Sequence, residues 1–137
     1  MIGLRPAFGD VDLRTQYAII PRMQLTFVQL SRFAARWAQL KLTDGDLQAL
    51  EKMLLRNPNA GPVVPGTGGL RKVRFAPPSR HVGKSGAFRV GYAYFRIADA
   101  VYLLAIYPKN EQATLTSSEK AEARQMIELI TRTLRQN

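Results

Sequence analysis

The residues best suited to chemistry in this chain are basic, and they are concentrated in one segment. Positions 70–97 contain seven lysine or arginine residues and no aspartate or glutamate, whereas the whole chain of 137 residues has 20 basic and 10 acidic residues. Guanidinium and ammonium groups bind phosphate oxygens, and Arg does so with two parallel hydrogen bonds. The pattern therefore indicates a phosphate-binding surface, with a solvated basic sheet face as the alternative.

Strand alternation places three of these basic side chains on one surface. In residues 70–75, Lys72 and Arg74 alternate with apolar residues, and in residues 88–95 Arg89 lies opposite an apolar face. Because apolar strand faces pack on helices, we expect these three side chains to project together from the other face of the sheet.

Other residues that could do chemistry give weaker patterns. His81 is the only histidine and could transfer protons, although its proline and glycine neighbours favour a hairpin loop. The sequence Gly83-Lys84-Ser85 is similar to the end of a nucleotide-binding Walker A loop, but Pro78 stands where that motif requires glycine and a strand is expected to follow. The chain has no cysteine, which excludes disulfides, thiolate zinc sites and a cysteine nucleophile. The carboxylates form no cluster, so we expect neither a metal nor a cofactor.

The elements that must position these residues follow from the spacing of apolar residues. They occur in the order strand, two helices, three strands, helix. This order predicts an α+β domain with one small antiparallel sheet and helices packed on it. The expected strands are at 24–28, 70–75, 88–95 and 100–107. The first helix is expected from Ser31, the second after a cap at Thr43 or Asp44, and the last after Thr116, which forms a capping box with Glu119.

Three segments, in this order, resemble the HigB branch of the RelE/ParE superfamily, which comprises the toxins of bacterial type II toxin–antitoxin modules. They are PGTGGLRKVRF at 65–75, GKSGAFRVGYAYF at 83–95 and YLLAIYPKNEQATLTSSEK at 102–120. The resemblance implies a RelE-like fold, a small antiparallel sheet with two N-terminal helices and a C-terminal helix. It begins at about Met23, so we expect residues 1–22 to be an N-terminal extension, residues 23–137 to be the toxin domain, and translation to begin at Met23.

The resemblance also implies an activity, metal-independent cleavage of mRNA in the ribosomal A site. In that reaction the RNA 2′-hydroxyl attacks the adjacent phosphate and leaves a 2′,3′-cyclic phosphate, which requires a proton acceptor, cations near the phosphate and a proton donor. By position in the motifs, Arg89 matches the phosphate-binding arginine of the family, Lys72 and Arg74 match the basic pair on the preceding strand, and Lys109 matches basic residues that follow the last strand.

Further binding residues are implied in the same way, and one part of the family site is missing. We expect Arg71, Arg80 and Lys84 to bind RNA. The family's C-terminal Arg and Tyr have no counterpart, since Asn110 aligns with the Arg and no tyrosine follows Tyr107. His81 or Lys109 is expected to take over proton transfer.

The partners implied by the resemblance are the ribosome, mRNA and a cognate HigA-like antitoxin with a helix-turn-helix domain. Operator DNA would be bound only by the antitoxin. Two alternatives stay open on the same fold, a ParE-like inhibitor of DNA gyrase and a non-catalytic nucleic-acid-binding regulatory subunit.

The longest apolar run, residues 101–107, is far shorter than the roughly 20 residues of a membrane span. The N-terminal residues lack the apolar core of a secretory signal. We therefore expect a cytoplasmic protein without a membrane partner.

Overall fold

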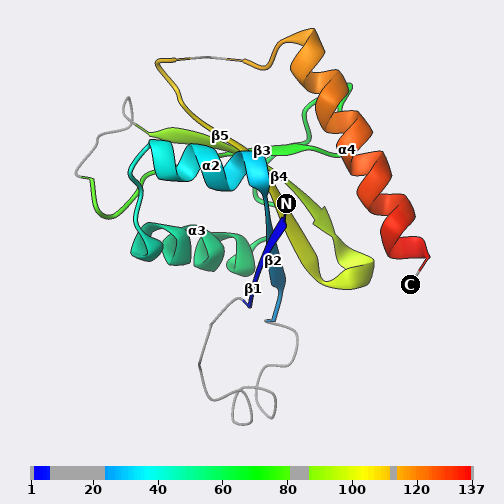
Figure 1. Cartoon of the computed structure of the whole chain (residues 1–137), viewed down its shortest axis with the longest axis horizontal. Helices are drawn as coiled ribbons and strands as arrows, with labels where there is room; N and C mark the ends of the chain where they lie inside the picture. Colours follow the sequence, from blue (N-terminus) through cyan, green and yellow to red (C-terminus); the bar gives the residue numbers. More distant parts are fainter. Residues whose placement is uncertain (1, 7–23, 81–86, 112–113, 137) are drawn as a thin grey trace.

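The predicted α+β organisation is confirmed, with one strand more than the spacing of apolar residues indicates. The computed structural model describes residues 2–6, 24–80, 87–111 and 114–136 (Figure 1). Among the described helices, none is long and apolar enough to cross a membrane. The elements are β1 (Ile2–Pro6), β2 (Thr26–Leu30), α2 (Ser31–Gln39), α3 (Asp44–Arg56), β3 (Arg71–Phe75), β4 (Phe88–Phe95), the short 3₁₀ helix η3 (Arg96–Ala98), β5 (Ala100–Pro108) and α4 (Ser117–Arg135).

The sheet is mixed, and the expectation of a purely antiparallel sheet is wrong. Its strand order is β1-β2-β5-β4-β3. β2 runs parallel to β5, with Thr26 opposite Ala100 and Gln29 opposite Leu103, whereas the other neighbouring strands are antiparallel. Parallel strands require a long crossover between them, and the helical hairpin α2–α3 followed by β3 and β4 provides one.

Helices pack on both faces of this sheet. Figure 1 shows α2 and α3 together on one side and α4 on the other. The larger core joins α2 and α3 to the apolar sides of β3 and β4, including Phe75 and Val90. The smaller core joins Ile127 of α4 to Leu70 and Leu104 and contains no described residue of β3. α4 therefore leaves the β3 end of its sheet face uncovered.

A buried carboxylate fixes the start of α3. Thr43 and Asp46 form a capping box, in which each side chain accepts a hydrogen bond from the other residue's backbone N–H. The Asp46 carboxylate also accepts hydrogen bonds from the backbone N–H and the hydroxyl of Ser79, at 2.9 and 2.6 Å. Asp46 thus ties α3 to the segment that follows β3.

The Asp46 contacts make the stability of the fold depend on pH. Burial alone would raise the pKa of the Asp46 carboxyl, but the hydrogen bonds from Ser79 and Thr43 outweigh burial and hold this pKa below its usual value. A carboxylate with a lowered pKa stabilises the fold above its unfolded-state pKa of about 3.9, and this contribution is lost as pH falls through the folded-state pKa. We expect Asp46→Asn to lower the free energy of unfolding by about 1–2 kcal/mol at neutral pH.

Thermal unfolding at about pH 7 and about pH 2 checks this expectation. The difference between Asp46→Asn and the unmodified protein should shrink at the lower pH, because the charged form of Asp46 is lost as pH falls through its folded-state pKa. Asp44→Asn changes the same charge at an exposed position of the same helix and serves as the control. An equal deficit of Asp46→Asn at both pH values would contradict a role of the charged form.

Candidate phosphate-binding site

Basic side chains meet on the part of the sheet face that α4 leaves uncovered. Arg74 of β3 lies directly opposite Arg89 of β4, and Arg89 lies directly opposite Tyr107 of β5. Residues directly opposite on neighbouring strands share a face, so these three side chains form a row across the sheet. Lys72 lies on the same face, two residues before Arg74 on β3. We call Lys72, Arg74 and Arg89 the basic cluster.

The basic cluster carries positive charge that no described residue neutralises. Arg74 is exposed, and Lys72 and Arg89 are half-buried. None of the three side chains forms an ion pair or hydrogen bond with another residue in the described part of the chain. Like charges at directly opposite sheet positions destabilise the fold, and an anion bound between them offsets this repulsion. The arrangement is therefore suited to binding a phosphate group.

Small residues continue the strands beside the basic cluster, and the side chain of Leu70 packs against them. Lys72 is opposite Gly91, and Gly91 is opposite Ala105. Gly91 is buried, and a Cβ atom there would lie 3.4 Å from the side chain of Leu70 and 3.6 Å from that of Ala105. The side chain of Leu70 therefore covers β4 at this point, so a ligand of the basic cluster would contact the side chains of the cluster and not the Gly91 backbone.

Tyr107, at the end of the row, has a buried hydroxyl group that makes no hydrogen bond with any described residue. Burial raises the pKa of the Tyr107 hydroxyl, the neighbouring Arg89 charge lowers it, and the Glu119 carboxylate raises it, with a raised pKa as the result. Tyr107 is therefore protonated at neutral pH and can donate a hydrogen bond. Residue types and spacing did not single out this side chain, because its place beside Arg89 depends on the register between β4 and β5.

Two of the predicted RNA-binding residues make contacts away from the basic cluster. Arg71 points to the other side of β3 and donates a hydrogen bond to the carbonyl oxygen of Gly61 at 2.7 Å. Arg80 donates to the carbonyl oxygen of Leu40 and lies over the ring of Phe88, 5.5 Å from its centroid. Both guanidinium groups therefore form hydrogen bonds that hold connecting segments against the rest of the fold.

The other candidates lie at or beyond the end of the row. Lys109 follows β5, its side chain is exposed, and its backbone N–H donates to the carbonyl oxygen of Ala87. Since Ala87 immediately precedes β4, Lys109 lies at the sheet end that also holds Arg89. His81 and Lys84 are outside the described residues.

The site as a whole offers recognition of an anion by side chains on three adjacent strands. Within the described ranges, no group of three or more histidine, aspartate or glutamate side chains is arranged to hold a metal ion. No protein-family model matches the chain.

Proposed function

We propose that the protein is a HigB-type toxin with a RelE-like fold that cuts mRNA on the ribosome. The observation that carries this proposal is the basic cluster, three cations on an open sheet face without counter-charges among the described residues. Cations fixed in this way stabilise the negative charge that develops on a phosphate during nucleophilic attack. The segments that resemble HigB toxins contain all three of these residues.

In the proposed reaction the RNA supplies its own nucleophile. The 2′-oxygen forms a bond to phosphorus, the bond from phosphorus to the 5′-oxygen breaks, and the products are a 2′,3′-cyclic phosphate and a 5′-hydroxyl. Arg74 and Arg89 bind the non-bridging oxygens, since a guanidinium group matches two phosphate oxygens at once. Lys72 adds a further charge beside them, and Lys109 and His81 are the candidates for proton transfer.

The proposed partners follow from the same resemblance. The ribosome presents mRNA in a fixed position, which adds binding energy that a small domain with few contacts lacks. A HigA-like antitoxin neutralises the toxin and carries the contact with operator DNA. An RNA substrate also agrees with the net charge of +10 on the chain.

Inducible expression in bacteria, followed by mapping of mRNA 5′ ends, tests the proposal. We expect growth arrest and new 5′ ends that are phased with codons, because the ribosome places the mRNA in register with the site. Arg89→Ala and Lys72→Ala should abolish both the arrest and the new ends at equal protein level.

Two other outcomes would overturn the proposal and point to different functions. Growth arrest with DNA-damage induction and intact mRNA would indicate inhibition of DNA gyrase. Absence of arrest, with RNA or DNA still bound by the purified protein, would indicate a non-catalytic nucleic-acid-binding subunit.

A further inference from the structure

A cleft of about 750 Å³ lies between α2 and α4, and it is not part of the basic cluster. Four consecutive residues of β5, Leu104 to Tyr107, lie along its floor. Apolar side chains of α4 form one wall, among them Met126 and Leu129, which are 38% and 51% exposed. Met126 faces the cleft and is not part of either core. The cleft is therefore an apolar depression of a size that admits a small organic group.

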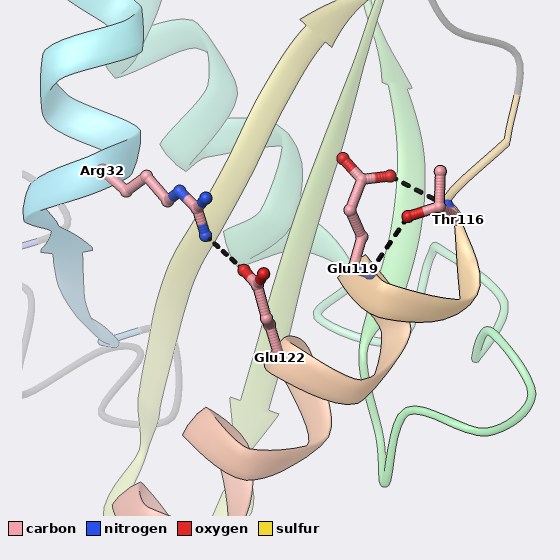
Figure 2. A network of polar contacts seen from close by, with 4 residues as sticks. All are labelled: Arg32, Thr116, Glu119 and Glu122. Carbon is pink, nitrogen blue, oxygen red and sulfur yellow. Dashed lines mark hydrogen bonds and ion pairs between the residues drawn. The ribbon is translucent and has the colours of Figure 1, made fainter.

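Four of the five charged side chains that line the cleft form ion pairs with one another, and the fifth, Glu119, belongs to the capping box of α4. Arg32 of α2 and Glu122 of α4 form an ion pair at 2.7 Å, which reaches from one helix to the other (Figure 2). Arg36 of α2 forms an ion pair with Glu111 at 2.5 Å. Because these cations have carboxylate partners, the cleft does not attract phosphate as the basic cluster does. A neutral group with polar edges fits it better.

Tyr107 connects the cleft to the basic cluster. Its side chain lines the cleft, and on the sheet it lies directly opposite Arg89. Neighbouring strands are about 5 Å apart, so a phosphate held by Arg89 lies within one nucleotide of the cleft. The Tyr107 hydroxyl is buried without a hydrogen bond to any described residue, and Tyr107 as a whole is only 8% exposed. A buried polar group of this kind is stabilised when a ligand supplies its partner.

We propose that the cleft between α2 and α4 receives an unstacked nucleobase of the RNA whose neighbouring phosphate is bound by the basic cluster. This inference rests on the proposed function, because it takes RNA as the ligand of the cluster. A base is planar and uncharged, its faces match the apolar wall and floor, and its edges can bond with Tyr107 and with the Gln125 amide, which also lines the cleft. The cleft would then select which base stands next to the phosphate.

An added peptide strand is the competing occupant, and the structure favours the base. β2 pairs only with Ala100 to Leu103, so residues 104–108 of β5 have no described strand on that side. α2, however, packs along β5 there, with Phe33 and Trp37 in the core beneath it. A peptide could reach the strand edge only if α2 moved, whereas a base needs no such movement.

The test is a double-mutant cycle between the cleft and the RNA base. The probe is a short RNA with a 2′-O-methyl group at the site of attack, so that it binds without being cut, and with each position in turn replaced by an abasic nucleotide. Binding is measured by protein NMR titration up to millimolar RNA. In the unmodified protein, loss of the base at one position should weaken binding about tenfold, the effect of one stacked base.

Filling the cleft should make RNA binding independent of the base at that position. Met126→Trp places a large ring in the cleft, so we expect it to bind the intact RNA about tenfold more weakly and to bind the abasic RNA as the unmodified protein does. Ala121→Trp adds the same ring at an exposed α4 position that does not line the cleft, and it should behave like the unmodified protein. Melting temperatures of both variants show whether the fold is kept.

The outcomes separate this inference from the proposed function. If base removal weakens binding equally in the unmodified protein and in Met126→Trp, or if removal of no base weakens binding, the cleft does not receive a base. Arg89→Ala in the same titration, together with the growth-arrest assay, tests the basic cluster independently. If Arg89→Ala loses RNA binding and Met126→Trp has no effect, the proposed function stands and only the inference about the cleft is overturned.

Discussion

Replacing Arg89 with alanine is expected to lower the rate of ribosome-dependent mRNA cleavage by about 10²–10³-fold. Arg89 occupies the centre of the row, opposite Arg74 on one side and Tyr107 on the other. Its charge can therefore contact the phosphate throughout the attack, and removing a fixed donor at that point costs transition-state stabilisation. The measurement is single-turnover cleavage of mRNA on purified ribosomes with saturating protein.

The controls for Arg89 separate position from charge. Arg96→Ala removes the same charge at an exposed position of η3, at the hairpin between β4 and β5, and should leave the rate within about twofold. Arg89→Lys keeps the charge but loses the two-pronged geometry, so an intermediate rate is expected. All three variants should fold, because the Arg89 side chain bonds to no described residue. Equal losses for Arg89→Ala and Arg96→Ala would mean that only net charge matters and would contradict a specific site.

Replacing Tyr92 with alanine is expected to lower the free energy of unfolding by about 3–5 kcal/mol, the largest loss of stability among the changes considered. Tyr92 is completely buried in the larger core. Its hydroxyl donates to the carbonyl oxygen of Pro58 at 2.8 Å and accepts from the backbone N–H of Gly61 at 3.0 Å. The free energy of unfolding of a typical domain is about 5–15 kcal/mol, so this one change removes a large share of it. Urea or thermal unfolding measures it.

Tyr92→Phe divides this effect into packing and hydrogen bonding. It keeps the ring but removes the hydroxyl partner of the buried Gly61 N–H and of the part-buried Pro58 carbonyl oxygen, for an expected loss of about 1–3 kcal/mol. Tyr94→Phe, on the same face of the same strand but half-buried, is the matched control and should change stability by no more than about 0.5 kcal/mol. If the two phenylalanine variants were equally stable, the contacts with Pro58 and Gly61 would contribute nothing.

Local signals in the sequence predicted most of the elements, and the reasons are visible in the structure. The capping box at Thr116 was predicted because Glu119 is three residues away, and it is present (Figure 2). At the start of α3 the sequence offered Thr43 or Asp44 as the cap; the structure has Thr43, in a capping box with Asp46. Alternation placed Lys72, Arg74 and Arg89 on one face because side chains on a strand change face at every residue. The first predicted strand was displaced by two residues, at 24–28 instead of 26–30, since its apolar run continues into α2.

These local signals could not predict which strands pair when the strands are far apart in the sequence. The parallel contact of β2 with β5 joins segments more than 70 residues apart in sequence, and alternation does not encode strand direction. The pairing of β1 with β2 escaped prediction because residues 1–22 show no clear period. Tyr107 lies beside Arg89 because of the register between β4 and β5, which includes an irregularity next to Gly91, and this register could not be predicted from the sequence. The site was thus predictable as three charges but not as a surface with a neighbouring cleft.

The segment before β3 also covers part of an outer strand edge, the kind of surface through which sheet proteins aggregate. Val63 forms an isolated bridge with Arg71, the Val64 N–H donates to the carbonyl oxygen of Leu70 at 2.7 Å, and the Lys72 N–H donates to that of Pro62 at 3.2 Å. A bare outer strand is a template on which a second chain can add its own strand, and repeated addition leads to fibres. Here the outer edge of β3 is already occupied at its first residues, Arg71 and Lys72, and Pro62 has no N–H to extend the ladder further. Shortening this segment would therefore expose β3 to edge-to-edge assembly while leaving the basic side chains in place.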